Sequence, residues 1–215
     1  MTSDSEFDLP KGVKSVSRET QQRLKQYFDL LIQWQSSINL ISPATVDQAW
    51  QRHFIDSLQI MDVVGEAETV VDIGSGAGFP GLVVAVLMAE RGSGRVHLVE
   101  SNGKKCAFMN AVIRATGLKD AGVQVEVVNN RIEKALPSVP RPDVVTARAL
   151  ASLNDLLTLT ETFLANGSVG VFPKGRGHEE EMKVAQGNWQ FSCNLTKSVL
   201  EDDSVILKIS ELRPR

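Results

Sequence analysis

The sequence predicts an α/β fold in which a mostly parallel sheet is covered by helices on both faces. From residue 67 onward, short runs rich in Val and Ile alternate with segments of helical periodicity, which is typical of such a sheet. The last two expected strands are separated only by EDDS and its neighbours. That segment is too short for a crossover helix and predicts an antiparallel hairpin. A glycine-rich segment, VVDIGSGAGFPG at 70–81, follows the first strand and predicts a ligand site there.

Two amphipathic helices are expected before the sheet. The first covers residues 17–36, with Ser17 as its N-cap and apolar residues at helical spacing. The second covers residues 45–64, with the same spacing from Val46 to Met61. These patterns divide the chain into a disordered lead-in (1–16), an N-terminal helical extension (17–66) and a main domain (67–215).

The main domain is expected to hold seven strands. The strands are placed at Thr69–Ile73, Arg95–Glu100, Val123–Val128, Asp143–Ala147, Ser168–Phe172, Phe191–Val199 and Val205–Ile209. Helices are placed between them at Pro80–Arg91, Lys104–Thr116, Arg131–Leu136, Leu153–Ala165 and His178–Gln186.

Length and composition exclude several classes of protein. A chain of 215 residues with 42% hydrophobic and 23% charged residues suits one main soluble domain, and we expect it in the cytoplasm. No apolar run reaches the roughly 18 residues of a membrane span. The net charge of −3 argues against a surface that binds nucleic acid everywhere. Residues 91–149 carry ten Lys and Arg against five Asp and Glu, so a local basic face is possible.

The glycine-rich segment is expected to form a ligand cradle at the end of the first strand. Gly74, Gly76 and Gly78 can adopt backbone angles closed to other residues, and they let a ligand approach the main chain. Pro80 suits the first turn of the following helix. Asp72 places a carboxylate beside the loop, which would attract an ammonium group and repel a diphosphate.

The choice of ligand depends on the register of this loop. Residues 76–81 formally satisfy the dinucleotide pattern G-x-G-x-x-G, but the match begins four residues past Asp72, and in the expected frame Phe79 replaces a glycine. No Gly-Lys-Ser or Gly-Lys-Thr follows, which disfavours a Walker-type phosphate loop. Glu100 ends the second strand, where it can accept hydrogen bonds from ribose hydroxyls in either NAD or S-adenosylmethionine. The loop therefore favours S-adenosylmethionine.

Several motifs in this order resemble one family. VVDIGSGAGFPG, LVESNGKK, NRIE, TARALASL and FPKGRG, with INLIS and RHFIDSL in the extension, are similar to the ribosomal small-subunit RNA guanine-N7 methyltransferases, also called glucose-inhibited division protein B. The resemblance runs from about Gln22 to the C-terminal strands. It implies a Rossmann-like class I methyltransferase that transfers a methyl group from S-adenosylmethionine to N7 of one guanine in 16S ribosomal RNA.

The resemblance also implies which residues contact the cofactor. By position, these contacts fall on Gly74, Phe79, Ile132, Glu133 and Arg148, with Ile132 and Glu133 flanking the adenine. No catalytic acid or base is expected, because N7 presents a lone pair without a proton and positioning alone can accelerate the transfer.

The FPKGRG segment supplies the expected RNA contacts. Lys174 and Arg176 follow the fifth strand and are candidates for binding phosphate groups of the RNA. In the extension, Arg52 and Asp56 are four residues apart and are expected to form a surface ion pair. The three His and two Cys show no metal-binding spacing, so no metal is expected.

Three alternatives remain open on the sequence. The chain could be a non-catalytic protein that binds an adenosine ligand, an NAD-dependent oxidoreductase, or a methyltransferase with a different substrate. The sequence does not determine the oligomeric state, although a monomer is expected. The partner is expected to be 16S ribosomal RNA or a precursor of the small subunit, without a membrane.

Overall fold

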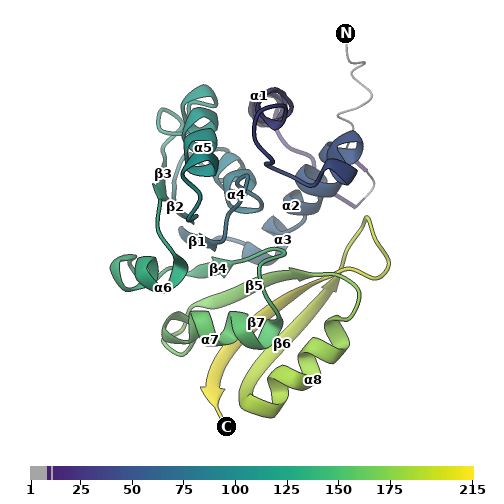
Figure 1. The fold of residues 1–215 in the computed structure, drawn as a ribbon, viewed down its shortest axis with the longest axis vertical. Coiled ribbons are helices and arrows are strands. Elements are labelled where there is room, and N and C mark those ends of the chain that lie inside the picture. Colours follow the sequence, from purple (N-terminus) through teal and green to yellow (C-terminus); the bar gives the residue numbers. More distant parts are fainter. Residues whose placement is uncertain (1–8, 11) are drawn as a thin grey trace.

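The computed structural model describes residues 9–10 and 12–215 and confirms the predicted α/β architecture (Figure 1). Its single sheet has seven strands in the order β3-β2-β1-β4-β5-β7-β6. Strands β1 to β5 are parallel, whereas β7 pairs antiparallel with both β5 and β6. The antiparallel C-terminal hairpin is therefore also confirmed.

The strands lie close to their predicted positions. They are β1 (Thr69–Ile73), β2 (Gly94–Val99), β3 (Val123–Val128), β4 (Val144–Thr146), β5 (Val169–Lys174), β6 (Trp189–Lys197) and β7 (Val205–Pro214). The largest difference is in β7, which is predicted to end at Ile209 but continues to Pro214, because its C-terminal half pairs with the start of β6. That half of the strand contains polar residues such as Glu211 and Arg213, so it does not form the apolar run by which the other strands were predicted.

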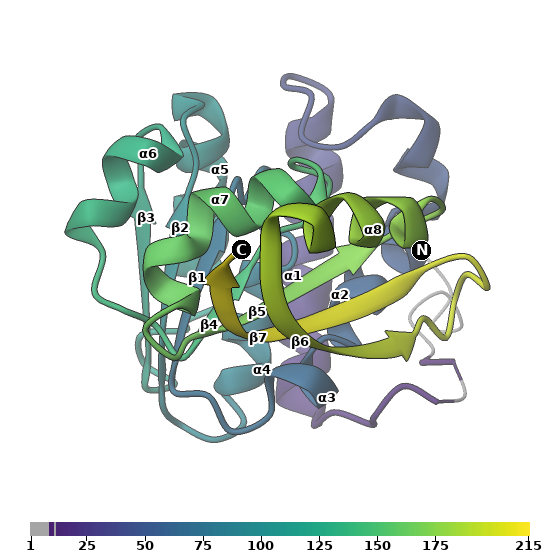
Figure 2. The same cartoon turned by 90° about the horizontal axis from the view of Figure 1, so that it is seen from below.

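Helices cover both faces of the sheet. They are α4 (Gly81–Met88), α5 (Gly103–Ala115), α6 (Ile132–Ala135, followed by a 3-10 turn at Leu136–Ser138), α7 (Leu153–Leu164) and α8 (His178–Asn188). Val70 of β1 packs in one core with α4 and α5, whereas Val71 and Ile73 face a second core built with α7. Figure 2 shows α6, α7 and α8 together on one side of the strands. The central strands β1 and β4 are thus buried on both faces, as their continuous apolar runs predict, whereas the edge strand β3 is only partly buried.

The N-terminal extension packs on the α4 and α5 side of the sheet. Helix α1 (Arg18–Gln35) begins at Ser17, whose hydroxyl accepts from the Thr20 backbone N–H as the predicted N-cap, and it contacts α4 and α5. Of the expected lead-in, residues 1–8 and 11 lie outside the described part, and Val13 and Val16 are partly buried against the core.

The second predicted helix is not continuous, and this prediction is wrong. Residues 45–64 fall in a 3-10 helix (Pro43–Gln48), a π-helix (Trp50–Ile55), and two short helices, α2 (Asp56–Leu58) and α3 (Met61–Val64). The wider π turn changes which residues share a face. Trp50, Phe54 and Leu58 are nevertheless buried in the core. The apolar spacing therefore predicted the buried residues correctly, although it did not predict the irregular helix.

The loop after β1 is held from below by α1. Tyr27 is fully buried, its hydroxyl donates to the Ala77 carbonyl, and its ring stacks on Phe79 at 5.2 Å between centroids. The Phe54 ring packs against Tyr27 in a T-shaped arrangement, with 4.8 Å between the ring centroids. The extension therefore supports the glycine-rich loop directly.

Replacing Tyr27 by Phe tests this support. The ring would stay in place, but the buried Ala77 carbonyl would lose its donor, so we expect the free energy of unfolding to fall by about 1–3 kcal/mol. Urea unfolding measures the change. The control is Ser36→Ala, which removes the exposed hydrogen bond from the Ser36 hydroxyl to the Gln33 carbonyl and should cost at most about 0.5 kcal/mol. Equal stability of the Tyr27 variant and the wild type would contradict the claim that the Tyr27 hydroxyl stabilises the loop.

Candidate active site at the glycine-rich loop

The site lies where the strand order reverses, between β1 and β4. In an open α/β sheet, the crevice at this point lies outside the carboxyl ends of the strands and holds ligands. The loop after β1 occupies that place. Its three alternating glycines have positive φ angles, 67° at Gly74, 59° at Gly76 and 94° at Gly78, so the prediction of unusual backbone angles is confirmed.

The three glycines face different surroundings. A Cβ atom at Gly78 would lie 2.5 Å from Leu82 and 2.7 Å from the Tyr27 hydroxyl, and one at Gly74 would lie 2.7 Å from Leu150. At Gly76 the nearest atom would be the Gly74 carbonyl oxygen at 3.9 Å. Gly78 and Gly74 therefore allow close protein packing, whereas the space beside Gly76 is open to a ligand.

Asp72 lies beneath the loop rather than at its surface. Its side chain is fully buried, with Oδ1 accepting from the Thr146 hydroxyl at 2.7 Å and Oδ2 from the Gly81 backbone N–H at 3.2 Å. Burial raises the pKa of Asp72 to about 6, although these two hydrogen bonds and the charge of Arg148 oppose the shift. A ligand above the loop would thus sense the charge of Asp72 without touching it.

This carboxylate also occupies the N-terminus of α4. In a dinucleotide-binding loop, that helix end holds the pyrophosphate. Here the first N–H of α4, on Gly81, is bonded to Asp72. Pro80, predicted inside the first turn of the helix, immediately precedes it. The geometry disfavours a phosphate at this position.

Glu100 lies directly after β2 and is joined to the loop. Its Oε2 accepts from the Gly76 backbone N–H at 2.9 Å, and its Oε1 accepts from the Asn102 backbone N–H at 2.8 Å. Each carboxylate oxygen has a second lone pair, so Glu100 can still accept from two ribose hydroxyls. The structure therefore brings Glu100 and Gly76 together at the open part of the loop.

Arg148 follows β4 and lies over the other end of the loop. Its guanidinium carbon is 5.3 Å from the centroid of the buried Phe79 ring, and the His53 ring stacks on Phe79 at 5.2 Å. The guanidinium donates to the Arg52 carbonyl at 3.0 Å and to Asp56 Oδ2 at 3.1 Å, and its Nη2 lies 2.7 Å from His53 Nδ1. The extension thus holds Arg148 in place.

The contacts of His53 fix its protonation. Because a guanidinium only donates, Nδ1 must accept, and the ring N–H is then on Nε2, 3.1 Å from the Thr45 hydroxyl. Burial, followed by the charges of Arg148 and Arg52, lowers the pKa of His53 to about 3. His53 is therefore neutral at physiological pH.

The predicted ion pair between Arg52 and Asp56 does not form. Arg52 pairs with Glu201 at 2.7 Å, and Asp56 pairs with Arg148 at 3.1 Å. The i,i+4 rule applies to a regular α-helix, whereas Arg52 lies in the π-helix, and each side chain meets a partner that is distant in sequence. Sequence reasoning missed these roles of His53 and Asp56. The available signal was the RHFIDSL motif, in which His53 and Asp56 are three residues apart and His53 precedes the apolar Phe54.

Ile132 and Glu133 begin α6, after β3. The Ile132 side chain is partly buried against the α7 core, and Glu133 is exposed. They follow β3, which pairs parallel with β2. The carboxyl ends of these two strands meet at one edge of the sheet, so Ile132 and Glu133 lie at the same edge as Glu100.

A cavity of about 630 Å³ extends from Arg148 toward β5 and β7. Lys174 lines this cavity, but its side chain is only 9% exposed and its Nζ bonds to Glu181 and to the Ala151 carbonyl, both at 2.7 Å. Arg176 points elsewhere, with 89% of its side chain exposed and Asp203 at 3.2 Å. The structure thus separates the two predicted RNA contacts.

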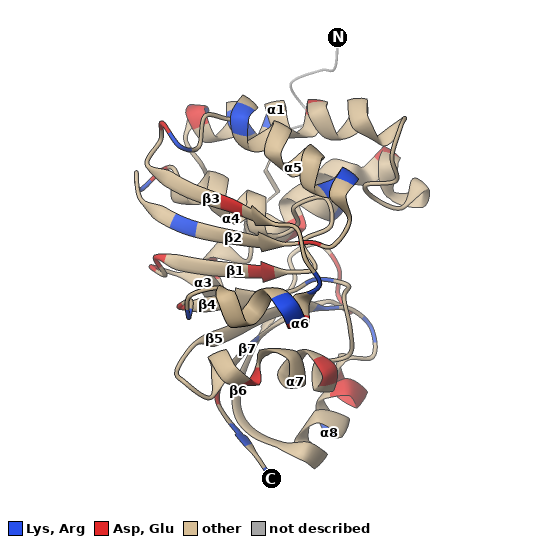
Figure 3. Cartoon of the chain, turned by 60° about the vertical axis from the view of Figure 1, so that its left-hand side comes forward, with Lys and Arg blue, Asp and Glu red and all other residues tan. Residues whose placement is uncertain are grey.

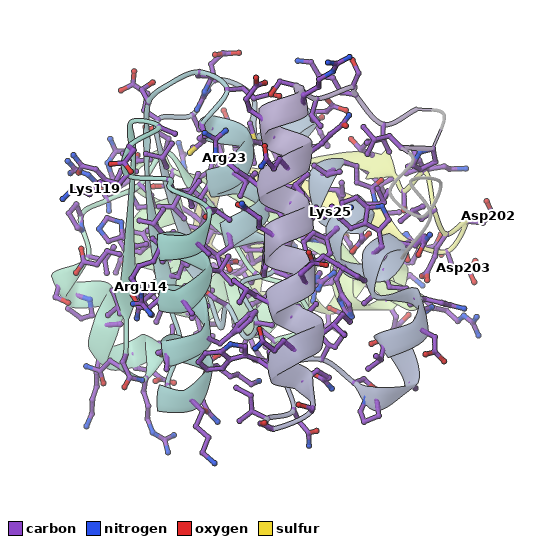
Figure 4. The ribbon with its side chains drawn as sticks, turned by 90° about the horizontal axis from the view of Figure 1, so that it is seen from above. Arg23, Lys25, Arg114, Lys119, Asp202 and Asp203 are labelled. Atoms are coloured by element: carbon purple, nitrogen blue, oxygen red, sulfur yellow. The ribbon has the colours of Figure 1, made fainter. Side chains whose placement is uncertain are left out.

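The surface charges are mixed. In the view of Figure 3, acidic and basic residues are interspersed along the chain. Figure 4 shows Arg114 and Lys119 at one side of the molecule and Asp202 and Asp203 at the opposite side. Within residues 9–10 and 12–215, no group of three or more His, Cys, Asp or Glu could hold a metal ion. No helix in the same part of the chain is long and apolar enough to span a membrane.

Alanine substitutions at Gly76 and Gly78 should separate ligand binding from folding. At Gly76 the protein has room for the methyl group, so we expect loss of stability of about 1 kcal/mol from the positive φ alone, and loss of ligand binding. At Gly78 the methyl group would overlap Leu82 and Tyr27, and we expect at least about 3 kcal/mol of destabilisation. Thermal unfolding and calorimetry with S-adenosylmethionine measure both effects. Equal destabilisation by the two variants would contradict this distinction.

Asp72 should make the free protein less stable as the pH rises. Its folded pKa of about 6 exceeds the unfolded value of 3.8, so the folded state holds the proton more tightly. Its contribution is complete below about pH 4, falls by about 3 kcal/mol as the pH rises from about 4 to about 6, and is constant above that. In Asp72→Asn, whose amide can still bond Thr146 and Gly81, this decline should disappear. Urea unfolding between about pH 4 and pH 8 compares the variants, and parallel curves would refute the assignment.

Comparisons with known proteins agree with this geometry. A family model described as rRNA small subunit methyltransferase G matches residues 20–205. Proteins called ribosomal RNA small subunit methyltransferase G from Brucella anthropi and Brucella ovis are 42% and 44% identical, over 99% of this chain and 98% of each relative.

Solved structures are similar in fold. A putative transferase from Pyrococcus horikoshii has a TM-score of 0.56 at 15% identity, covering 84% of this chain and 67% of its own. P. horikoshii TYW2 in complex with MeSAdo has a TM-score of 0.53 at 16% identity, with coverages of 83% and 65%. The family match and the whole-chain identity to the Brucella proteins are decisive, and the chain belongs to the rRNA small subunit methyltransferase G family.

Proposed function

We propose that the protein transfers a methyl group from S-adenosylmethionine to N7 of one guanine in 16S ribosomal RNA. The observation that carries this proposal is the loop after β1, which is open at Gly76, joined to Glu100 and underlain by the buried carboxylate of Asp72. Family membership identifies the class of reaction, and the guanine N7 target follows from the resemblance of the motifs.

The residues at the loop fit S-adenosylmethionine. The open space at Gly76 admits a ligand, and the free lone pairs of Glu100 suit two ribose hydroxyls. The charge of Asp72 favours an ammonium group near the loop. We also assign cofactor contacts to the main chain of Gly74, Gly78 and Phe79, to Ile132 and Glu133 beside the adenine, and to Arg148.

The reaction does not require a catalytic base. When bound, S-adenosylmethionine supplies a methyl group on a positively charged sulfur. The N7 atom of guanine has a lone pair and no proton, so the purine takes up the positive charge and nothing has to be deprotonated. His53, which is neutral and engaged with Arg148, positions that guanidinium instead of accepting a proton from the substrate. The protein therefore acts by alignment and electrostatics.

The structure favours Arg176 over Lys174 as a phosphate contact. A phosphate needs an accessible cation, and the exposed Arg176 pairs among the described residues with Asp203, which is itself exposed. Lys174 would have to leave Glu181 and the Ala151 carbonyl before it could bind a phosphate. We propose that the enzyme acts as a cytoplasmic monomer on the ribosomal small subunit or its precursor.

The alternatives on the sequence make different predictions for binding. An NAD-dependent enzyme would have to bring a pyrophosphate to a helix end already bonded to a carboxylate. A protein that only binds an adenosine ligand would need no cavity beside Arg148.

Cells that lack the gene should lose one 7-methylguanosine from 16S ribosomal RNA. Mass mapping of the RNA identifies the position. The purified protein should restore the modification on small subunits from these cells with labelled S-adenosylmethionine, whereas Gly76→Ala should lower the rate at least about tenfold. Glu180→Gln, an exposed control in the same chain, should restore it at the rate of the wild type. An unchanged methylation pattern in the deletion strain would refute the substrate.

A further inference from the structure

The cavity beside Arg148 is a second compartment of the site. Its walls come from the N-terminal extension, from Pro173 and Lys174 of β5, from β7, and from the hairpin between β6 and β7. Its volume of about 630 Å³ is within the range of pockets that enclose small ligands. Arg148 lines the cavity and also lies over Phe79 of the glycine-rich loop, so the two compartments meet at this guanidinium.

The charged groups of the cavity neutralise one another. Each cation is bonded to an acid: Arg52 to Glu201 at 2.7 Å, Arg148 to Asp56 at 3.1 Å and Lys174 to Glu181 at 2.7 Å. The acid beside each cation cancels the charge that would attract a phosphate and would repel a phosphate bound next to it. The cavity therefore suits an uncharged polar ring rather than the RNA backbone.

The three acids differ in how their oxygens are occupied. Each oxygen of Asp56 already accepts one hydrogen bond, from Gln59 or Arg148, and each oxygen of Glu201 accepts one, from Ser204 or Arg52. The hydrogen bonds of Glu181 with described residues all fall on Oε2, which accepts from Lys174 Nζ and from the Leu153 backbone N–H, both at 2.7 Å.

Glu181 is thereby held in place, and its Oε1 accepts no hydrogen bond from any residue that the structure describes. Its side chain is 33% exposed and lines the cavity. An oxygen that only accepts selects a partner with donors. Guanine presents N1–H and N2–H₂ together on its Watson–Crick edge, whereas adenine presents an acceptor at N1.

We propose that the cavity beside Arg148 holds the target guanine and that Oε1 of Glu181 accepts from its N1–H and N2–H₂ groups. This inference rests on the proposed function and adds a specificity-determining residue to it. The Watson–Crick edge and N7 lie on different edges of the purine, so a carboxylate bonded to N1–H and N2–H₂ leaves the N7 lone pair free to receive the methyl group.

The same contact favours the transfer itself. The guanine ring is neutral before the reaction and positively charged after it. A carboxylate bonded to the ring therefore attracts the product-like state more strongly than the starting state. Replacing Glu181 should lower kcat as well as the discrimination between bases.

Inosine, which lacks the N2 amino group, distinguishes base recognition from a structural role. Small subunits are reconstituted with guanosine or inosine at the methylated position, and transfer of labelled methyl groups is measured. For the wild type, inosine should lower kcat/KM about 10- to 100-fold, as expected for a lost hydrogen bond to a charged group. Glu181→Gln should lower kcat/KM for guanosine by a similar factor, and inosine should then change the rate less than about threefold.

Controls distinguish a loss of base recognition from a folding defect and from failure of the proposed function. Calorimetry should show that Glu181→Gln binds S-adenosylmethionine within about twofold of the wild type, and Glu180→Gln should keep the full inosine effect. If Glu181→Gln does not fold, Glu181→Asp retains the charge but withdraws the carboxylate, and should lose the inosine effect equally. An inosine effect of equal size in the wild type and the folded Glu181 variant would overturn the inference. Failure of the proposed function would instead appear as absent transfer to guanosine by the wild type.

Discussion

The buried carboxylate of Asp72 determines the local architecture of the site. It connects the end of β1 to β4 through Thr146 and to the start of α4 through Gly81. A carboxylate without exposure is costly, and its raised pKa expresses that cost. Because the helix end is already bonded to an anion, the proposed place for the ligand is at Gly76, on the side of Glu100. A structural hydrogen bond thereby disfavours a phosphate at the start of α4.

The helical extension contributes to the site as well as to the core. His53 and Asp56 bind the guanidinium of Arg148, and Tyr27 binds the loop through the Ala77 carbonyl. The low pKa of His53 matters here, because a protonated ring would repel Arg148 and would have no acceptor for it. The loop and Arg148 are thus positioned by residues that precede the sheet in the sequence, and loss of the extension would leave Phe79 without three of its neighbours.

Periodicity and turn chemistry predicted the sheet, because β-branched runs and glycines are local signals. The same reasoning located Gly74, Gly76 and Gly78 and the acid at the end of β2. It could not predict that Asp72 is buried, since burial depends on Thr146 and α4, which meet it only in the fold. It also assumed α-helical spacing for Arg52 and Asp56, where a π-helix and distant partners decide the pairing.

The proposed transfer to N7 would explain why the site, as far as the structure describes it, contains paired charges and no free base. A reaction that requires no proton removal can be accelerated by placing two reactants and by favouring the charge that the purine acquires. Unpaired cations near the purine would oppose that charge, so the pairing of Arg148 with Asp56 and of Lys174 with Glu181 lowers their effect on it. Exposed cations such as Arg176 can bind the RNA backbone farther away. In the proposed arrangement, the base compartment is neutral overall and the backbone contact is separate and exposed. The enzyme could therefore bind the anionic RNA without placing unpaired cations beside the positively charged purine.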